Sequence, residues 1–391
     1  MARLSLTARG EARVRAGHPW VYRADVARLE GPWEPGEAVS VADPAGRVLG
    51  RGFYNPRPQI ACRLLTWHDE AVDRAFFRRR LETAWRFRQS LAYDGDAGRV
   101  VFSEGDRFPG LILDRYGDLL VLQALTLGTE AHAPALAELA AEIVGARAVY
   151  RRADPTAGAI EGLRGASGWL TGEAELEVEI REGPCRFRVA LAEGQKTGFY
   201  LDQRENRAAV AALAAGREVL DAFCYTGAFG AWALRHGAVR VLAIDASAEA
   251  SARARQHAAA NGGVERFEVE ESNAFDALRE LDRAGRRFDL VILDPPSFTR
   301  RKTAVEAAVR GYKEINLRGL RCLRPGGVLA TFSCSHHVPG ALFEEVCRAA
   351  AADAGRAVRV RAALTQARDH PVLLAVPETR YLKGLLLEVI E

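Results

Sequence analysis

Four strands predicted in the second half of the chain each end at a polar side chain of the kind that binds nucleotide-like ligands. In chain order these side chains are Asp221, Asp245, Asn273 and Asp294, at the ends of the predicted strands 217–223, 240–246, 266–272 and 288–294. A carboxylate after the second strand can accept hydrogen bonds from both hydroxyls of a ribose, and an amide can bind the edge of an adenine. Since open α/β sheets bind ligands at the carboxyl ends of their strands, we expect these side chains to form one site.

The first of these strands runs into a glycine turn, DAFCYTGAFG, at residues 221–230. Gly227 and Gly230 either let the backbone approach a ligand or let a helix pack closely on the sheet. The turn lacks the first glycine of the G-x-G-x-x-G pattern that cradles a pyrophosphate, and it offers Asp221 and a phenylalanine instead. A carboxylate is a better partner for a sulfonium cation and an amino acid than for a phosphate, so the turn predicts S-adenosylmethionine as the cofactor.

Cys334, in the segment TFSCSHH, follows the predicted strand 326–333 on the cofactor side of the sheet. A cysteine in a loop is accessible, and a neighbouring cation would lower the pKa of its thiol, so a nucleophile is one interpretation. Inert packing is the other, because free cysteines are commonly small buried side chains. The adjacent His336 and His337 do not predict a metal site, since neighbouring residues rarely converge on one ion and the sequence offers no third ligand.

The elements that position these residues alternate strictly between strand and helix, which predicts a doubly wound α/β domain over 191–391. Residues 1–68 contain short strands, with a hairpin turn at Asp43, and predict a small β-barrel. Residues 69–190 combine strands and helices and predict a compact α+β domain. The first helix of that domain, at about 69–92, is amphipathic and crowded with arginine.

Composition and charge exclude several classes of protein. The 391 residues are 48% hydrophobic and 27% charged, as in ordinary globular proteins, and no apolar run reaches the ~20 residues of a membrane span. The N-terminus has no apolar signal core, so we expect a cytoplasmic protein. The six cysteines form no Cys-x-x-Cys pair, which argues against a zinc knuckle or a disulfide framework. Residues 1–92 carry 16 arginines against 10 acidic side chains, which indicates either a solvated surface or a module that touches a polyanion.

The order of the motifs resembles that of the class I RNA methyltransferases, and most closely that of the RlmI-type 23S rRNA cytosine-5 methyltransferases. The resemblance covers nearly the whole chain. PGEAVSVADPAGRVLGRGFYNPRPQIACRLL looks like the PUA domain of that family, and SEGDRFPGLILDRYGDLLVLQ looks like its central α+β domain. The blocks that look like its catalytic domain are EGQKTGFYLDQRENR, DAFCYTGAFG, DPPSF, SCSHH and HPVLLAVPETRYLKGL.

This resemblance implies an α/β fold: a Rossmann-like class I methyltransferase domain preceded by a small PUA-like β-barrel and an α+β domain. It implies S-adenosylmethionine as the cofactor and ribosomal RNA, most closely 23S, as the partner, with no metal and no membrane. Whether the chain forms a homodimer is left open. The residues that we expect to bind the cofactor are Thr197, Tyr200, Gln203, Asp221, Phe223, Gly227, Asp245, Ala246, Asn273, Ala274, Phe275, Asp294 and Pro295.

Around the block EGQKTGFYLDQRENR several further side chains have two interpretations each. Phe199 could wall the cofactor or base pocket, and Lys196 and Arg204 could meet a carboxylate or a phosphate, with ordinary packing or salt bridges as the alternative. Asp202 is expected to cap the helix that follows it.

The family resemblance implies that Cys334, which matches the cysteine of the SCS block, is the nucleophile. Carbon 5 of cytosine cannot attack a methyl group until a thiolate adds at carbon 6, so such an enzyme needs a reactive cysteine and an acid at N3. Asp294 is expected to hold N3 and the exocyclic amine, with capping of its loop as the alternative. Ser297 stands where some cytosine-5 enzymes carry a second cysteine.

Three other functions stay open at this point. An RNA methyltransferase that modifies a guanine nitrogen would need no thiolate, and DPPSF-like loops occur in such enzymes too. A non-catalytic RNA-binding protein with a decayed methyltransferase fold would bind RNA without binding S-adenosylmethionine. A small-molecule methyltransferase would act without RNA and would make little use of the arginine-rich N-terminal residues.

Overall fold

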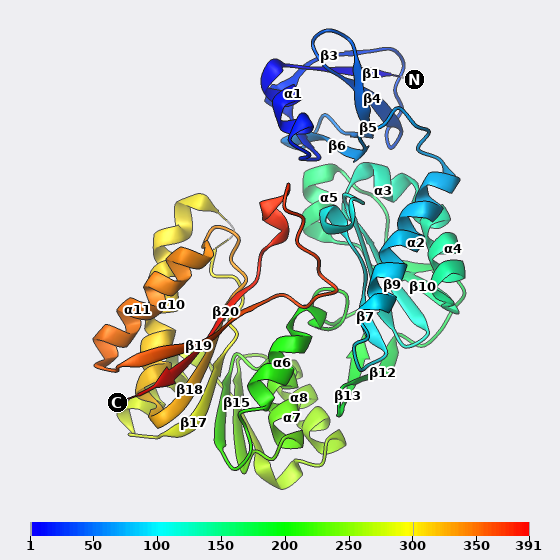
Figure 1. Ribbon diagram of the computed structural model, residues 1–391. Helices are drawn as coiled ribbons and strands as arrows, with labels where there is room; N and C mark the ends of the chain where they lie inside the picture. The colour runs from blue at the N-terminus through cyan, green and yellow to red at the C-terminus, as the bar shows by residue number, and fades with distance from the viewer. Residues whose placement is uncertain (1, 300, 391) are drawn as a thin grey trace. The chain divides into compact units, whose positions relative to one another are not determined.

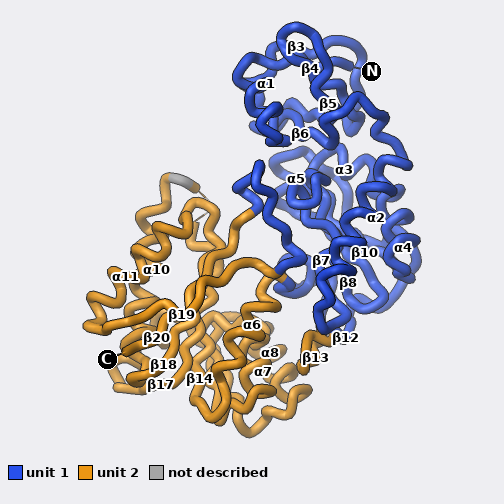
Figure 2. Tube along the Cα trace, in the orientation of Figure 1, with its two compact units in different colours: residues 1–180, 189–201, 368–379 blue, residues 181–188, 202–367, 380–391 orange. Residues whose placement is uncertain are grey.

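The computed structural model describes residues 2–299 and 301–390, and these divide into two compact units (Figure 2). The first unit takes the described residues of 1–180 together with 189–201 and 368–379. The second takes the described residues of 181–188, 202–367 and 380–391. Two segments from later in the sequence, 189–201 and 368–379, therefore belong to the N-terminal unit.

A six-stranded sheet, in the order β2-β6-β5-β4-β1-β3, forms the N-terminal part of the first unit (Figure 1). Its elements are β1 (Arg3–Leu6), α1 (Ala8–Arg15), β2 (Trp20–Tyr22), β3 (Val26–Glu30), β4 (Ala38–Ala42), β5 (Val48–Tyr54) and β6 (Ile60–Thr66). The predicted hairpin is confirmed, because β4 and β5 pair antiparallel and the Asp43 carboxylate accepts the N–H groups of Ala45 and Arg47 between them. Leu4 and Val39 lie in the buried core of this sheet.

A five-stranded sheet, in the order β11-β10-β9-β8-β7, forms the centre of the same unit. Its strands are β7 (Ala97–Phe102), β8 (Leu111–Tyr116), β9 (Leu119–Ala124), β10 (Ala148–Arg151) and β11 (Gly168–Thr171). Its helices are α2 (Arg74–Ser90), α3 (Leu127–Ala131), α4 (Ala133–Val144) and α5 (Pro155–Glu161). Asp73 caps α2 by accepting the Phe76 N–H, and the apolar side of the helix packs into the core through Phe76, Phe77 and Leu81.

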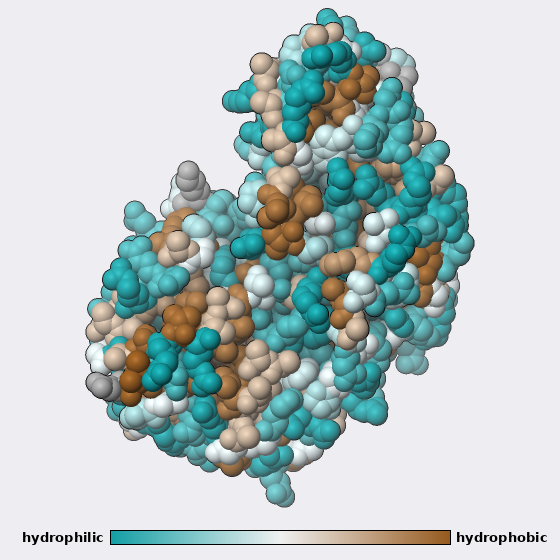
Figure 3. Space-filling view, in the orientation of Figure 1, coloured by the Kyte–Doolittle hydropathy of each residue, from teal (hydrophilic) through white to brown (hydrophobic). Residues whose placement is uncertain are grey.

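The arginines on the outer side of α2 are largely engaged within the first unit. Arg74 and Arg78 form ion pairs with Glu138 and Glu142 of α4, and a further arginine of α2 pairs in the same way with a glutamate ahead of the helix. These pairs are exposed, and Figure 3 shows a mainly hydrophilic surface over α2. The structure therefore favours a solvated, ion-paired face for this helix over a face of free positive charges.

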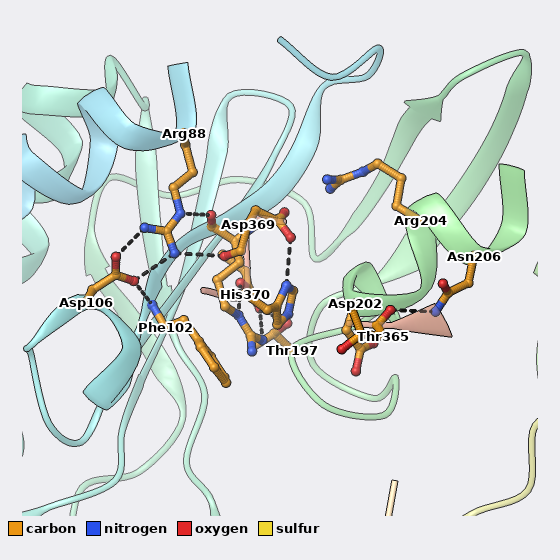
Figure 4. A network of polar contacts seen from close by, with 12 residues as sticks. Arg88, Phe102, Asp106, Thr197, Asp202, Arg204, Asn206, Thr365, Asp369 and His370 are labelled. Carbon is orange, nitrogen blue, oxygen red and sulfur yellow. Dashed lines mark hydrogen bonds and ion pairs between the residues drawn. The ribbon is translucent and has the colours of Figure 1, made fainter. Parts of the chain in front are cut away.

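Arg88 departs from the arginine-rich face expected for α2, because its side chain is fully buried. The guanidinium binds both carboxylate oxygens of Asp106 and donates to the carbonyl oxygens of Arg99 and Asp369 (Figure 4). A buried guanidinium is tolerated only when its N–H groups are satisfied in this way. For Arg88 the expected surface position is wrong, and its role is structural.

The two later segments of the first unit are tied to its central sheet by buried polar contacts. The Thr197 hydroxyl donates to the Asp114 carboxylate, which also forms a buried ion pair with Arg99. From the other segment, the Asp369 carboxylate accepts the backbone N–H of Arg99 at 2.9 Å. The domain boundary expected at residue 190 therefore does not coincide with the division between the units.

The hairpin of β12 (Glu177–Glu182) and β13 (Cys185–Ala190) crosses from one unit to the other in sequence. Both carboxylate oxygens of Glu182 accept hydrogen bonds from Arg207, at 2.7 and 2.6 Å, and one also accepts the Trp232 indole N–H at 2.9 Å. These buried contacts explain why 181–188, expected to be part of the central domain, belongs to the second unit.

A seven-stranded sheet organises the second unit, in the order β16-β15-β14-β17-β18-β20-β19. Its strands are β14 (Glu218–Ala222), β15 (Arg240–Asp245), β16 (Phe267–Glu271), β17 (Phe288–Leu293), β18 (Leu323–Ser333), β19 (Val358–Thr365) and β20 (Lys383–Val389). The first five strands in this order pair in parallel, and β20 runs antiparallel to β18 and β19. This is the doubly wound arrangement that the sequence predicts, with its switch point between β14 and β17.

The described helices of the second unit cover both faces of this sheet. One face packs on α6 (Arg204–Ala211), α7 (Ala228–Arg235) and α8 (Ala248–Ala260), and the other on α9 (Ala274–Arg283), α10 (Val305–Arg321) and α11 (Gly340–Ala354). Single 3₁₀ turns occur at η1 (Arg23–Asp25), η2 (Ser103–Asp106), η3 (Leu201–Gln203), η4 (Val264–Arg266), η5 (Lys302–Ala304) and η6 (Pro377–Thr379). Across the described part of the chain, none of the helices has the length and apolar character needed to span a membrane.

The close packing of α7 on this sheet can be tested with Gly230→Ala. A Cβ at this position would lie 2.6 Å from the Phe267 ring and 3.1 Å from the Val241 side chain. Overpacking of this kind costs about 1–3 kcal/mol, so we expect a lower urea midpoint of unfolding. Gly168→Ala is the control, because no atom lies within 4 Å of a Cβ there. Equal midpoints for the two variants would contradict the packing described.

Candidate active site

The carboxyl ends of the central parallel strands meet at one edge of the second unit's sheet. Ala222 of β14 pairs with Ile244 of β15 on one side and with Leu293 of β17 on the other. Asp245 and Asp294 are the next residues along those two strands, so they flank the end of β14. The structure thus brings together strand-end residues that the sequence singles out, at the switch point where such sheets bind ligands.

Asp221 lies on β14 with its carboxylate almost completely buried. Its Oδ2 accepts the N–H of Gly230 at 3.0 Å, whereas its Oδ1 has no hydrogen-bond partner among residues 2–299 and 301–390. Burial raises the pKa of Asp221 to about 8, and the charges of Asp294 and Asp245 act in the same direction. Because an unsatisfied buried oxygen is costly, this one fits a ligand that brings an N–H group or a positive charge.

The turn after β14 is held in an uncommon backbone conformation. Phe223, Tyr225 and Gly227 have φ angles of 63°, 50° and 73°. A non-glycine residue in this region costs about 1–3 kcal/mol and persists where the surroundings fix it. Asp245 fixes it here, since one carboxylate oxygen accepts the Tyr225 N–H at 2.8 Å and the other accepts the Ser247 N–H at 2.9 Å.

The same turn holds a second unsatisfied polar atom and the two predicted glycines. The Thr226 hydroxyl is buried and has no hydrogen-bond partner within the described residues. A Cβ on Gly227 would lie 2.9 Å from Ala254, and one on Gly230 would meet the Phe267 ring. Close packing of α7 therefore explains both glycines, and contact of Gly227 with the cofactor stays a prediction.

Aromatic rings gather beside these strand ends. The Phe223 ring lies edge-on to Phe275 at 5.8 Å between centroids, Phe275 lies 5.5 Å from Phe298, and Phe298 lies 4.5 Å from Tyr312. Asn273 is exposed, and its side-chain oxygen caps α9 by accepting the Phe275 N–H at 2.9 Å. An amide engaged through its oxygen still has its N–H groups to offer to an adenine edge.

Three further expected cofactor residues also have side chains that are hydrogen-bonded within the protein. Besides Thr197, described above, the Tyr200 hydroxyl donates to the side chain of Gln195, and the Gln203 side-chain oxygen accepts from Asn206 at 2.6 Å. Thr197 and Tyr200 belong to the first unit and Gln203 to the second. Their contacts with the cofactor stay predictions, as do those of Ala246, which is exposed, and of the buried Ala274 and Pro295.

Asp202 and Arg204 have structural contacts. The expectation that Asp202 caps α6 is wrong, because the N-cap is Gln203 and the Asp202 carboxylate accepts the Tyr381 hydroxyl at 2.6 Å. Arg204 is buried, and its guanidinium lies 3.9 Å from the Glu182 carboxylate. For Arg204 this supports the salt-bridge interpretation.

Cys334 differs in exposure from the other cysteines. All six lie in the described part of the chain, and Cys334 is half-buried while the others are buried. Burial raises the pKa of four of these thiols to about 12, namely Cys62, Cys185, Cys322 and Cys347. Cys334 follows Ser333, the last residue of β18, so the least buried of the six thiols comes directly after the end of that strand.

The loop that carries Cys334 is fixed by the residue after it. The Ser335 hydroxyl is hydrogen-bonded to the Ser297 hydroxyl at 3.0 Å and to the Tyr312 hydroxyl at 2.9 Å. Ser297 belongs to the DPPSF loop that follows β17, so the two loops are joined directly. Where some cytosine-5 enzymes carry a second cysteine, this chain has a serine that holds the Cys334 loop in place.

Asp294 is half-buried at the start of the DPPSF loop, with the buried Pro295 next to it. It follows Leu293, which pairs with Ala222 of β14, and its charge contributes to raising the pKa of Asp221. Asp294 therefore stands between the β14 turn and the end of β18, the strand that leads to Cys334. Within the described residues no cluster of three or more His, Cys, Asp or Glu side chains could hold a metal ion.

These features fit S-adenosylmethionine. The unpartnered Asp221 oxygen suits a cationic group, and the Thr226 hydroxyl suits a polar one. The Asp245 carboxylate uses one hydrogen bond on each oxygen, and each oxygen has lone pairs left for a ribose hydroxyl. The Phe275 ring can flank an adenine.

Sequence reasoning did not single out Tyr312, Ser335 or Lys383. Tyr312 and Ser335 act through hydroxyl contacts that only the folded chain reveals. Lys383 donates to the Ser335 carbonyl at 2.7 Å, so it contacts the Cys334 loop directly. One signal was available for it: a chain with 54 basic residues has lysine at just four positions, and 383 is one of them.

Comparison with known proteins shows which family the chain belongs to. Residues 134–360 match the model of the S-adenosylmethionine-dependent methyltransferases, and residues 4–67 match that of a PUA-like domain. The chain is 42% identical over 381 residues to the ribosomal RNA large subunit methyltransferase I of Alteromonas mediterranea, with 96% of each chain covered. It is 40% identical to the protein of that name in Shewanella amazonensis, with 99% of each chain covered.

Solved structures of similar fold agree with this match. A SAM-dependent methyltransferase from Streptococcus mutans has a TM-score of 0.85 at 21% identity, and SMU.776, a methyltransferase complexed with SAH, has a TM-score of 0.87 at 21% identity. Each comparison covers 100% of both chains. The order of PUA-like and methyltransferase domains predicted from the sequence is confirmed.

Proposed function

This chain belongs to the family of the ribosomal RNA large subunit methyltransferases I, which are S-adenosylmethionine-dependent, and we propose that it methylates carbon 5 of a cytosine in 23S ribosomal RNA. The observation that carries the proposal is the position of Cys334. Its thiol is the least buried of the six, and it follows β18 at the edge where Asp221, Asp245 and Asp294 gather. Methylation of a guanine nitrogen would not require a thiol nucleophile.

In the proposed reaction Cys334 first makes the base nucleophilic. Its thiolate adds to carbon 6 of the cytosine, and the displaced electron pair makes carbon 5 an enamine carbon. S-adenosylmethionine supplies the electrophilic methyl group when bound. After carbon 5 has gained the methyl group it loses its proton to a base, and the electrons of that C–H bond restore the ring double bond as the Cys334 sulfur leaves carbon 6 as a thiolate.

Asp294 supports this chemistry from the neighbouring strand end. An acid at N3 withdraws electrons from the ring and assists addition at carbon 6. In its protonated form the Asp294 carboxyl would donate to N3 and accept from the exocyclic amine of cytosine, a pattern that uracil does not offer.

The target base has to leave its stack to reach Cys334. A paired cytosine would be flipped out, and an unpaired one would bind directly. The PUA-like sheet and the excess of arginine in residues 1–92 support phosphate contacts that hold RNA without reading its sequence. Because the outer arginines of α2 are ion-paired, we assign less of this role to α2 than its composition indicates.

The proposal is tested with purified protein, 23S ribosomal RNA from cells that lack the gene, and isotopically labelled S-adenosylmethionine. After digestion to nucleosides, mass spectrometry should find the label in 5-methylcytidine. Label in a methylated guanosine would replace the proposal with the guanine alternative. Label transfer without any RNA would point to a small-molecule substrate.

Ser297→Ala tests the link between the two loops. This substitution removes the hydrogen bond to Ser335. A neutral hydrogen bond typically contributes about 1 kcal/mol, so the Cys334 loop should be held less firmly by about that free energy. We expect the single-turnover methylation rate at saturating S-adenosylmethionine to fall roughly three- to tenfold, with unchanged cofactor affinity. Ser90→Ala, at the exposed end of α2, is the matched control and should leave the rate unchanged. A Ser297→Ala rate equal to the control would show that the link is dispensable.

A further inference from the structure

Lys383 lies at the same edge of the sheet as Cys334 because β20 runs antiparallel to its neighbour. Ser333, the last residue of β18, pairs with Lys383, the first residue of β20. The neighbouring residue pair fixes the register of β20 against β18. Gly384 pairs with Phe332, and a Cβ on Gly384 would lie 2.5 Å from the Phe332 ring. A strand that returns in this direction delivers its first side chain to the loop that starts at Cys334.

The Lys383 ammonium is held by backbone carbonyls. Its Nζ donates to the carbonyl oxygens of Ser335 at 2.7 Å and of Tyr381 at 2.8 Å, and no salt bridge to a carboxylate is formed within the described residues. An ammonium group has three donors, so two carbonyl bonds leave one. A half-buried cation without a neutralising carboxylate is uncommon in a chain whose arginines are so widely ion-paired.

The charges of Lys383 and Cys334 act on each other. Burial lowers the pKa of Lys383 to about 8, and the ionised Cys334 sulfur acts in the opposite direction and raises it. The effect is mutual, because an ammonium that is stabilised by a thiolate stabilises that thiolate equally. A neighbouring cation is one of the standard means by which proteins lower the pKa of a reactive thiol.

We infer that Lys383 is a positioning residue for Cys334: it holds the Cys334 loop through the Ser335 carbonyl and stabilises the thiolate form of the Cys334 sulfur. The inference rests on the proposed function only for the use to which the thiolate is put. For carbon 6 addition, a thiolate present at neutral pH removes the need for a base to deprotonate the thiol in the same step.

Other titratable groups lie near Lys383 and Cys334 and also influence the charge at this edge. Tyr312, from α10, is neutral in the relevant range, because burial raises its pKa. Tyr381 precedes the strand and its hydroxyl is bound to the Asp202 carboxylate. Asp294, at the neighbouring strand end, would oppose a thiolate when ionised. Lys383 is therefore a cation beside Cys334 at an edge that also carries acidic groups.

The test is the rate of Cys334 alkylation by iodoacetamide as a function of pH, followed by mass spectrometry of the Cys334 peptide. In the unchanged protein the midpoint should lie below about 8.5, the ordinary value for a cysteine thiol. In Lys383→Met the midpoint should rise by about one unit, and the rate at pH 7 should fall about tenfold, with recovery at high pH. Lys383→Arg should stay close to the unchanged protein.

The matched control is Lys313→Met, because Lys313 is a half-buried lysine of α10 that is paired with Asp353. It should not move the midpoint. A midpoint in the unchanged protein at or above the ordinary thiol value would overturn the inference without any variant. So would a Lys383→Met midpoint equal to the control, which would mean that Lys383 merely ties down the loop.

The readout needs no RNA and no turnover, so it separates this inference from the proposed function. A shifted midpoint together with label in methylguanosine would leave the Lys383–Cys334 pairing intact and remove the cytosine proposal. An unshifted midpoint together with label in 5-methylcytidine would do the reverse. Binding of S-adenosylmethionine, measured by calorimetry, verifies that each variant is folded.

Discussion

Cys334→Ala is expected to transfer no detectable methyl group to ribosomal RNA, while it binds S-adenosylmethionine as tightly as the unchanged protein. The side chain is half-buried and follows β18, so its removal leaves no large cavity in a core. Without a thiolate to add at carbon 6, carbon 5 of cytosine stays a poor nucleophile. Loss of a covalent nucleophile typically costs at least about a thousandfold in rate.

The measurement combines methyl transfer with trapping of the adduct. RNA that carries 5-fluorocytidine cannot lose a proton from carbon 5, so the sulfur–carbon bond persists and the complex survives denaturing electrophoresis. The unchanged protein should form this complex and Cys334→Ala should not. Cys347→Ala is the control, since that cysteine is buried among α10 and α11. Full methylation by Cys334→Ala would remove the nucleophile from the account.

Asp221→Asn is expected to weaken binding of S-adenosylmethionine by roughly a hundredfold, the scale of losing one partner of a buried charged contact. The amide can still accept the Gly230 N–H, so the turn after β14 keeps its main anchor. What disappears is the charge that the cationic cofactor meets. In the unchanged protein the affinity should rise with pH up to about 8, because Asp221 has to ionise before it pairs with a cation. The Asn variant should lack this dependence.

The same substitution should change the pH dependence of stability. The pKa of Asp221 is about 8 in the folded protein against an ordinary 3.8. Between these values the folded state keeps a proton that the unfolded state loses, so the contribution of Asp221 to stability falls as pH rises. Over the whole window this amounts to a few kcal/mol, in order of magnitude. Unfolding temperatures of the cofactor-free protein should therefore fall less between pH 5 and 8.5 in Asp221→Asn.

Two measurements test what is expected of Asp221→Asn. Calorimetric titration at pH 6, 7 and 8 gives the affinities, and scanning calorimetry gives the unfolding temperatures. An affinity that does not vary with pH in the unchanged protein would show that Asp221 is already ionised or does not meet the cofactor. Ser247→Ala, on the exposed residue that binds Asp245 through its backbone, serves as a control that should keep both pH profiles.

The strand-end residues were predictable because a buried parallel strand is an apolar run in the sequence. The residue that ends such a run emerges at the edge of the sheet, as Asp245 and Asp294 do. The hairpin at Asp43 was equally local, since its turn chemistry lies within a few residues. Features whose physical cause lies within one element were therefore accessible from the sequence.

Features that depend on distant partners were not accessible. Helical spacing predicts a face for Arg88, but its burial depends on Asp106 and on a carbonyl 281 residues away. Thr197 lies in a block that resembles a catalytic motif, but its hydroxyl donates a hydrogen bond to the Asp114 carboxylate in the central sheet. Lys383 reaches the Cys334 loop because β20 turns back antiparallel, which an apolar run does not reveal.

We propose above that this chain methylates carbon 5 of one cytosine of 23S ribosomal RNA by means of Cys334. Bisulfite sequencing tests it directly, because 5-methylcytosine resists the deamination that converts cytosine. Ribosomal RNA should be compared from cells with the gene, without it, and with a Cys334→Ala copy. We expect one protected cytosine in 23S RNA that disappears without the gene and is not restored by Cys334→Ala. The same protected cytosines in all three samples would contradict it.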